Sequence, residues 1–345
     1  MSTSETTPTS PWSLTHIDLL SERYGGQVLD CNDEFFAQAS NLLKRSEPVF
    51  IEDKYTDRGK WMDGWETRRR RSEGHDWCLL QLGIPGRICA IDVDTRFFKG
   101  NAPSHIAIDA CCCNEPTPNS NTVWQTLVAK SPVRPHSRNN FAPESSVTGT
   151  DNWTHLRLNI FPDGGVARLR IYGEPQVDWS SLLPNELVDL AACANGGRAI
   201  ACSDMFFSPM NNLLAPGRGI NMGDGWETRR RRGAGNDWVI IKLASPGKLG
   251  RVVVDTCHFK GNYPERISLE GTMSDREDLS AEDIPWTPVI AGTPVQAHRE
   301  HVFQRELLAT EALFSHVRLN IFPDGGVSRL RVFAYPDTGH KAAQS

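Results

Sequence analysis

One nine-residue segment occurs twice in this chain, letter for letter. It reads Asp-Gly-Trp-Glu-Thr-Arg-Arg-Arg-Arg and spans residues 63–71 and 224–232. The offset of 161 residues (224 − 63) also relates shorter segments, which are Asp76-Trp77 and Asp237-Trp238, 98–101 and 259–262, and 159–166 and 320–327. Ordered segments that recur at one constant offset are the signature of a duplication. The chain is therefore predicted to contain two copies of one domain.

The length of 345 residues suits this division, since one domain usually has about 100–200 residues. Hydrophobic residues make up 39% of the chain and charged residues 23%, as in ordinary globular proteins. We predict a disordered tail over residues 1–13, a first repeat over 14–174, a connector over 175–195, a second repeat over 196–336 and a C-terminal tail over 337–345.

Short apolar segments bounded by turn residues predict strands in both repeats. Residues 77–82 and 88–95 are rich in Leu, Ile and Val, and the Pro85-Gly86 pair between them predicts a turn. Residues 105–110 alternate polar and apolar side chains, which is typical of a strand with one solvated face. Many such strands with little helix between them predict an antiparallel β-sandwich or barrel in each repeat.

The strongest strand pair is expected near the end of each repeat. Residues 155–160 and 166–172 flank a Pro-Asp-Gly-Gly segment, which predicts a β-hairpin. Leu and Ile would enter the core on one face, and the opposite face would be basic. That face is expected to carry His155, Arg157, Asn159, Arg168 and Arg170. It would contact a carboxylate-bearing ligand, meet acidic residues of another subunit, or be solvated.

Two segments outside these strands have their own predictions. The connector is expected to contain a short helix that begins at Pro184 and continues through residues 186–191, because proline is favoured as the first helical residue. Residues 52–61 are polar and have no counterpart in the second repeat, so we expect a surface loop there.

Composition narrows the classes of function. The net charge of −5 and the pI near 6.1 give no support for a nucleic-acid partner, despite two runs of four arginines. Apolar runs of membrane-spanning length and an apolar signal segment are absent from the sequence. The nine cysteines are an odd number, which argues against a disulfide framework shared by both repeats. We expect a cytoplasmic protein without membrane or nucleic-acid partners.

Several polar residues in the repeated motifs are candidates for chemistry. Asp63 and Glu66 precede the arginine run, and arginines can clamp an anion while a carboxylate moves a proton. Lys99 and Asn101 lie in a loop and could donate to a carboxylate or carbonyl, and His155 could act as a general base. The structural alternatives are an ion-paired loop, a solvated lysine and a strand histidine bound to a carboxylate. Sequence alone leaves these alternatives open.

Taken together, the duplicated motifs resemble those of the allantoicase family over residues 15–335. The resemblance implies two tandem jelly-roll repeats of the galactose-binding-like type and assembly into a homo-oligomer. It also implies hydrolysis of allantoate to ureidoglycolate and urea in purine degradation. A non-catalytic jelly-roll protein that binds a ligand is the alternative, because a fold does not by itself define a function.

Allantoate carries one carboxylate and two ureido groups on a single carbon, so its cleavage requires an anion clamp, an acid and a base. The catalytic candidates in the two copies are Asp63, Glu66, His155, Asp224, Glu227 and His316. The candidates for substrate binding are Arg68, Arg70, Lys99, Asn101, Arg229, Arg231, Lys260 and Asn262. They would form two sites or one site between the copies. No cofactor is predicted, and dependence on a divalent metal stays open, because scattered Asp, Glu and His residues can converge in space.

Overall fold

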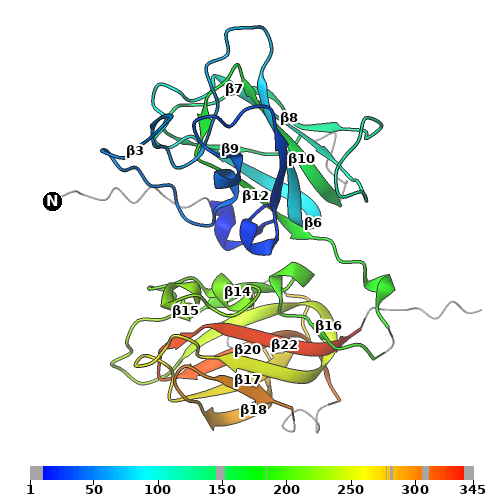
Figure 1. The fold of residues 1–345 in the computed structure, drawn as a ribbon. Coiled ribbons are helices and arrows are strands. Elements are labelled where there is room, and N and C mark those ends of the chain that lie inside the picture. The colour runs from blue at the N-terminus through cyan, green and yellow to red at the C-terminus, as the bar shows by residue number, and fades with distance from the viewer. Residues whose placement is uncertain are drawn as a thin grey trace, which may run out of the picture. The chain divides into compact units, whose positions relative to one another are not determined.

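Two compact units divide the chain in the computed structural model, a first unit over Met1–Gln176 and a second unit over Val177–Ser345 (Figure 1). The structure describes residues 11–144, 152–183, 185–276, 278, 279, 283–304 and 311–337. Each unit contains an eight-stranded antiparallel sheet with the same strand order. The prediction of an all-β tandem repeat is confirmed.

The first unit consists of strands and 3-10 turns. Its strands are β1 (Ile17–Asp18), β2 (Gln27–Cys31), β3 (Tyr55–Thr56), β4 (Gly59–Lys60), β5 (Trp65–Glu66), β6 (Asp76–Asp94), β7 (His105–Cys111), β8 (Gln125–Pro132), β9 (Arg138–Phe141), β10 (Trp153–Phe161), β11 (Gly165–Val166) and β12 (Arg168–Pro175). Its 3-10 turns are η1 (Pro11–Leu14), η2 (Glu22–Tyr24) and η3 (Ala39–Leu43).

The second unit repeats this order. Its strands are β13 (Val188–Asp189), β14 (Arg198–Cys202), β15 (Trp226–Glu227), β16 (Asp237–Asp255), β17 (Arg266–Thr272), β18 (Thr287–Pro294), β19 (Glu300–Phe303), β20 (Leu313–Phe322), β21 (Gly326–Val327) and β22 (Arg329–Pro336). Its 3-10 turns are η5 (Trp179–Ser181), η6 (Cys193–Asn195), η7 (Met210–Leu214) and η8 (Met222–Asp224).

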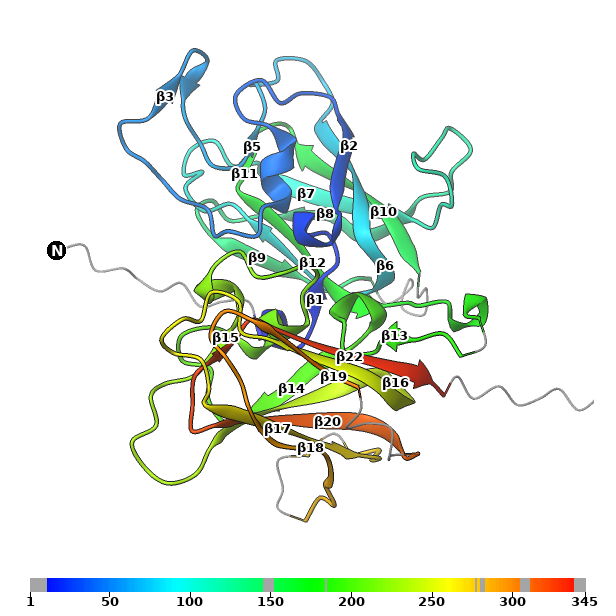
Figure 2. The same ribbon diagram turned by 60° about the horizontal axis from the view of Figure 1, so that its bottom comes forward.

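The long strand β6 organises the first unit, and β16 has the same place in the second. One end of β6 pairs with β2 and β10, and the other end pairs with β9 and β12 (Figure 2). Alternate residues of β10 enter the core, as the sequence predicts, and Leu156, Leu158 and Ile160 are fully buried. The opposite face of β10 carries the polar residues.

The predicted turn at Pro85-Gly86 is wrong, because β6 runs through this pair without interruption. Gly86 pairs with both Trp153 and Pro175. A Cβ atom at Gly86 would lie 2.3 Å from the carbonyl oxygen of Glu174. The glycine therefore allows two neighbouring backbones to approach closely within the sheet, and it does not reverse the chain.

The predicted hairpin is also wrong, although both of its strands exist. β10 and β12 each pair with β6 and lie on opposite sides of it. The Pro-Asp-Gly-Gly segment leads into β11, where Val166 pairs with Trp65 of β5. Arg168 and Arg170 consequently do not share a basic face with Arg157. That expectation depended on the hairpin and is wrong for the same reason.

The connector does not form the predicted helix. Pro184, its expected first residue, lies outside the described residues, and Asn185 has a φ of 62°, which a right-handed helix does not accept. Val188 and Asp189 form β13 and pair with β22, as Ile17 and Asp18 pair with β12 in the first unit. Val188 and Asp189, inside the segment predicted as a helix, instead form a strand of the second sheet.

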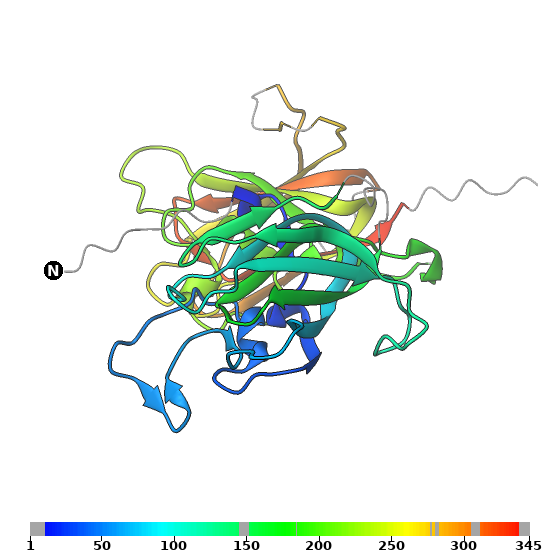
Figure 3. The same cartoon turned by 90° about the horizontal axis from the view of Figure 1, so that it is seen from above.

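The remaining segments are assigned as follows. Residues 1–10 of the predicted N-terminal tail and 338–345 of the C-terminal tail lie outside the described residues, and η1 begins at Pro11. Residues 52–61, expected as a loop, contain the short hairpin of β3 and β4, which projects from the first unit (Figure 3). Within the described part of the chain, every helix is too short or too polar to cross a bilayer.

Candidate functional site

Three of the duplicated motifs meet in space in each unit. In the first unit, Glu66 of β5 pairs with Gly165 of β11, and the N–H of Gly165 donates to the carbonyl oxygen of Asn101 over 2.7 Å. Phe98 is fully buried between them. A Cβ atom at Gly165 would lie 2.0 Å from the Phe98 ring, and one at Gly64 would lie 2.8 Å from it. The glycines of two motifs thus make room for the phenylalanine of the third.

This packing places Glu66, Lys99 and Asn101 in one cavity of about 290 Å³, which we call the Glu66 pocket. Its lining residues are Phe36, Phe50, Lys60, Met62, Glu66, Phe97, Lys99, Gly100 and Asn101. Among these residues, Glu66 alone bears a carboxylate, and two lysines supply positive charge. The cavity therefore combines an acid, an amide and two cations beside apolar walls.

The environment of Glu66 favours its protonated form. Burial raises the pKa of the Glu66 carboxyl, and the hydrogen bond from Asn101 only partly opposes this shift. The Asn101 amide nitrogen donates to Glu66 Oε1 over 2.7 Å. Among the described residues, no arginine forms an ion pair with Glu66, so no guanidinium lowers the pKa of this carboxyl. A carboxyl of this kind suits a general acid.

Aromatic side chains build the apolar wall of the pocket. The rings of Phe50 and Phe97 stack with centroids 5.8 Å apart, and Lys60 Nζ lies 4.7 Å from the Phe50 centroid. Phe97 has a φ of 71°, which is uncommon for a residue other than glycine. Its backbone N–H donates to His136 Nδ1 over 2.8 Å, and this bond helps to hold the unusual conformation. The two rings and Glu66 line the same cavity, so the carboxyl shares this cavity with an apolar wall.

The second unit keeps the polar residues and changes the walls. The Asn262 amide donates to Glu227 Oε1, and burial again raises the pKa of the Glu227 carboxyl. Lys260 occupies the position of Lys99. At the positions of Met62 and Phe97 the second unit has Gly223 and His258. Between η7 and β15 the second unit contains the short turn η8. It has no counterpart there of the β3–β4 hairpin, which carries Lys60.

Asp63 and Asp224, predicted to be catalytic, do not join these sites. Asp63 Oδ2 is 2.7 Å from Arg168 Nη2, and both side chains are buried. Asp224 makes the same pair with Arg329 over 2.7 Å. Burial by itself would raise the pKa of Asp63, but the bonds from Arg168 and from the backbone of Val49 outweigh it and lower that pKa. This geometry is that of a structural ion pair, and the catalytic role of Asp63 stays a prediction.

Arg68 and Arg70 of the arginine run likewise bind acidic residues outside the Glu66 pocket. The backbone N–H and Nε of Arg68 both donate to Asp33 Oδ2, and Arg70 Nη2 lies 2.5 Å from Asp76 Oδ1. The second unit repeats both arrangements, in the pairs Arg229–Asp204 and Arg231–Asp237. These arginines brace the loop that follows β5 and its counterpart after β15.

His155 and His316 lie on β10 and β20 and are almost fully buried. Burial lowers the pKa of His155, although the Pro116 carbonyl 3.3 Å from its Nε2 opposes the shift. Burial and the nearby charge of Lys242 lower the pKa of His316 to about 4. Both imidazoles are neutral near pH 7, and neither lines the Glu66 pocket.

The sequence did not point to Phe50, Lys60, Met62 or Phe97 as pocket residues. These positions lie outside the letter-for-letter repeats, so the duplication does not point to them. One signal was present, because Lys60 belongs to the segment that only the first repeat contains. An insertion found in one copy is a reasonable place to look for a functional difference between copies.

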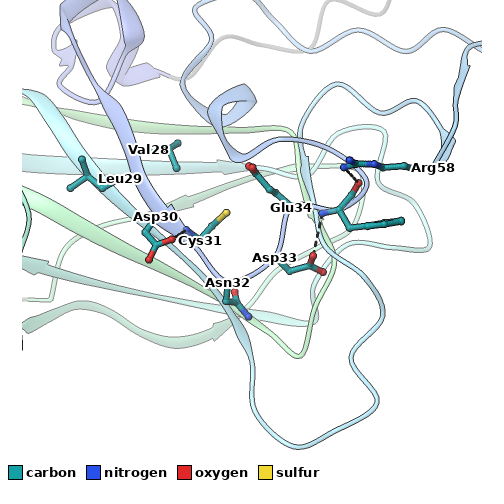
Figure 4. Close-up of a pocket in the computed structure, with 9 residues that line it drawn as sticks. Val28, Leu29, Asp30, Cys31, Asn32, Asp33, Glu34 and Arg58 are labelled. Carbon is teal, nitrogen blue, oxygen red and sulfur yellow. Dashed lines mark hydrogen bonds between the residues drawn. The ribbon is translucent and has the colours of Figure 1, made fainter.

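A second hollow of the first unit, of about 520 Å³, is acidic (Figure 4). Asp30, Asp33 and Glu34 line it, and Arg58 bonds the carbonyl oxygen of Phe35 at its edge. Burial and the neighbouring Glu34 raise the pKa of Cys31 to about 12, so this thiol is not a ready nucleophile. The negative charge of this hollow does not suit an anionic substrate.

One group of potential metal ligands stands out in the described part of the chain. Single donor atoms of Cys257, His258 and His298 lie within 4.8 Å of one another. However, His298 Nδ1 accepts the backbone N–H of His258 over 2.8 Å, which places the proton of the neutral ring on Nε2. Neither nitrogen of His298 then has a free lone pair for a metal. His136 makes the same bond in the first unit, which indicates a structural histidine.

The fold and the site define a class of tandem jelly-roll proteins with a glutamate–asparagine pair in each unit. Comparison with known proteins identifies the family. The family model described as the allantoicase repeat matches residues 17–176 and again residues 188–337. The chain belongs to the allantoicase family, which confirms the resemblance found in the sequence.

Individual relatives agree with this assignment. A probable allantoicase of Pseudomonas aeruginosa (strain UCBPP-PA14) is 50% identical over 324 residues, which cover 93% of this chain and 96% of that protein. An allantoicase of Dictyostelium discoideum is 48% identical and covers 91% of this chain and 86% of its own length. The crystal structure of a Saccharomyces cerevisiae allantoicase is 34% identical, with a TM-score of 0.76 over 92% of this chain and 93% of that one. The chain is an enzyme of this family, and the non-catalytic alternative is not retained.

Proposed function

We propose that this chain hydrolyses allantoate to ureidoglycolate and urea in purine degradation, and that the reaction takes place in the Glu66 pocket of the first unit. The observation that carries the assignment to the pocket is the state of Glu66. Its carboxyl has a raised pKa, no arginine partner among the described residues, and two lysines in the lining of the same pocket. Membership of the allantoicase family supports the reaction itself.

The lining of the pocket fits the groups of the substrate. Lys60 and Lys99 would bind the allantoate carboxylate, in the place that the sequence suggested for arginines. Asn101 already donates one N–H to Glu66, and its amide has a second N–H and a carbonyl oxygen for a ureido group. Phe50 and Phe97 would cover the carbon that reacts. Opposite charges in a partly dry cavity attract more strongly than in water.

A single carboxyl can serve both proton transfers. Protonated Glu66 gives its proton to the nitrogen of the departing urea as the C–N bond breaks, and the lone pair of the remaining ureido nitrogen forms a C=N bond. Water then adds to that carbon, and the Glu66 carboxylate accepts the proton that the water loses. Ureidoglycolate and urea result, and Glu66 returns to its protonated form. This use of one group as acid and then base follows ordinary general catalysis.

The differences between the units favour the first as the active one. Only the first unit has the hairpin that presents Lys60, and only it has Met62 and Phe97 at the wall. Gly223 and His258 at the matching positions leave Glu227 with less apolar cover. We therefore propose one active site per chain, with Glu227, Lys260 and Asn262 as its inactive counterparts.

Replacing each glutamate by glutamine tests this proposal. Glu66→Gln removes the acid and base, so urea release from allantoate should fall by a factor of about 10²–10⁴ in kcat. Glu227→Gln is the matched control and should keep most of the activity. Similar thermal unfolding of both variants would show that the fold is intact. A loss of about half the activity in each variant would instead indicate two independent sites, and complete loss in both would indicate a shared site.

Two further properties are proposed. We propose a homo-oligomer, for which light scattering of the purified protein gives the mass directly. We also propose a cytoplasmic location, which is supported by nine cysteines that form no disulfide in the structure. Cell fractionation with a periplasmic or organellar marker would test it.

A further inference from the structure

A larger cavity of the first unit has no part in the chemistry above. It measures about 650 Å³ and lies on the face of the sheet that points away from the core. We call it the sheet-face pocket. Its lining residues are His75, Trp77, Leu79, Ala107, Asp109, Pro118, Asn119, Trp124, Arg157, Asn159 and Phe161. None of them lines the Glu66 pocket, and a cavity of this size is typical of small-molecule sites.

The strand register explains why these residues share one face. Arg157 of β10 lies opposite Leu79 of β6 and Asp109 of β7. Asn159, two residues further along β10, lies opposite Trp77 and Ala107. The intervening residues of the same strands point to the core. The floor of the pocket is therefore rigid sheet, and its edge is the segment between β7 and β8.

The polar groups on the floor are mostly engaged with one another. Asp109 Oδ2 accepts hydrogen bonds from Arg157 Nη2 and Asn159 Nδ2, each over 3.0 Å. Its Oδ1 accepts the hydroxyl of Thr126 over 3.0 Å. The carboxylate thus has little capacity left for a ligand. Arg157 keeps a side chain that is 39% exposed, so the group available to an incoming molecule is a cationic donor.

Aromatic rings surround this donor. The guanidinium carbon of Arg157 lies 5.0 Å from the ring centroid of Trp124. Lys130 Nζ lies 4.3 Å from the centroid of Phe161, and the His75 ring is 4.5 Å from the same ring. The two cations, Arg157 and Lys130, outnumber the one carboxylate, Asp109, so this face has an excess of positive charge. The open surface offers π faces and positively charged donors together.

The second unit shows how the same face looks when it is filled. The polar residues of this face are retained in the second unit. Arg318 and Asn320 both donate hydrogen bonds to Glu270, and the Arg318 guanidinium lies over the Trp286 ring. There, however, Leu279 and Ile284 from the segment between β17 and β18 are buried against the sheet. The first unit has Pro118 and Asn119 in the corresponding segment and leaves the space open. These polar residues are therefore structural in both units, and in the second unit the described side chains of Leu279 and Ile284 pack against the sheet at this face.

We propose that the sheet-face pocket binds a planar ring compound that carries negative charge. A flat ring can stack on the indole of Trp77 or Trp124, and stacking is favourable for any π face. A carboxylate or ring oxygen can then meet Arg157, which pairs well with planar anions. A ligand with many hydrogen-bond donors and few acceptors would not be matched by this floor. The Asp109 carboxylate already accepts hydrogen bonds from Arg157, Asn159 and Thr126.

Orotate, a planar anionic ring, is a suitable probe for calorimetry and tryptophan fluorescence with the full chain. We expect binding of one orotate per chain that weakens as salt increases. Trp124→Ala should weaken it about tenfold or more, and Ala107→Leu, which fills the floor, should abolish it. Trp286→Ala, at the filled face of the second unit, is the matched control and should bind orotate as the unchanged protein does. Unchanged thermal unfolding would show that each variant is folded.

Other outcomes would overturn the proposal. Equal binding of uracil would remove the requirement for charge, and equal binding of cyclohexanecarboxylate would remove the requirement for a planar ring. Absence of binding at millimolar orotate, or a change of molecular mass in Trp124→Ala, would indicate that the face is empty or covered by a second copy of the chain. Glu66→Gln should bind orotate normally, so this test is independent of the site proposed for catalysis.

Discussion

Replacing Asp63 by alanine separates a structural role from a catalytic one. Asp63 looks catalytic in the sequence, three residues before Glu66, but the structure buries it against Arg168. Removing one partner of a buried ion pair usually costs about 3–5 kcal/mol, because the other charge is left without compensation. The low end applies here. The Arg168 guanidinium would keep bonds to the carbonyl oxygens of Ser46, residue 63 and Ala167.

A cost of about 3 kcal/mol should lower the Tm of the first unit by about 6–12 °C, since 1 kcal/mol shifts a domain of this size by about 2–4 °C. Scanning calorimetry would measure the shift. Asp224→Ala is the matched variant and should destabilise the second unit by a similar amount, through Arg329.

Urea release decides between the two roles. At a temperature well below the lowered Tm, folded Asp63→Ala should retain near-normal kcat, because Asp63 does not line the Glu66 pocket. If Asp63→Ala unfolds at the same temperature as the unchanged protein but releases no urea, the structural reading of this residue is refuted.

Three other outcomes follow from single residues. His316 has a pKa of about 4 when folded and about 6.5 when unfolded, so its contribution to stability is full above pH 6.5 and is lost as pH falls towards 4. The loss is about 3 kcal/mol, and urea denaturation of His316→Gln at pH 7 and pH 4.5 should show a smaller pH dependence. Gly165→Ala should cost about 3 kcal/mol, because its Cβ would overlap the buried ring of Phe98, and thermal unfolding would record it. Arg68→Ala should cost less than about 1 kcal/mol in the same assay, because the Arg68 side chain is 63% exposed and the backbone N–H of residue 68 still donates to Asp33.

Predictions from the sequence were correct where they depended only on residues that are close together in the chain or on the repeat itself. Alternation of Leu and Ile with polar residues located β7 and β10 and identified their buried faces, because side chains of a strand alternate between two sides. The constant offset identified the duplication without any structural information. The same motifs that revealed the repeat also contain Glu66, Lys99 and Asn101, which the structure brings together.

Predictions that depended on neighbours were less successful. Residues 155–172 contain everything that a hairpin needs locally, yet β6 lies between the two strands. Residues 186–191 have the composition of a helix, yet β22 offers Val188 and Asp189 a free edge. In both cases pairing with a distant strand outweighs the local preference, because it satisfies backbone groups that would otherwise be unpaired.

The sequence by itself determined the repeat, the all-β class, the family and the residue types available for chemistry. Only the tertiary structure decided which carboxylate is free to react. Asp63 and Glu66 stand three positions apart and look equivalent, but a buried arginine from β12 lowers the pKa of the first, and burial raises the pKa of the second against a hydrogen bond from Asn101. The partner that fixes the proton affinity of a carboxylate comes from elsewhere in the chain, and folding alone brings it there.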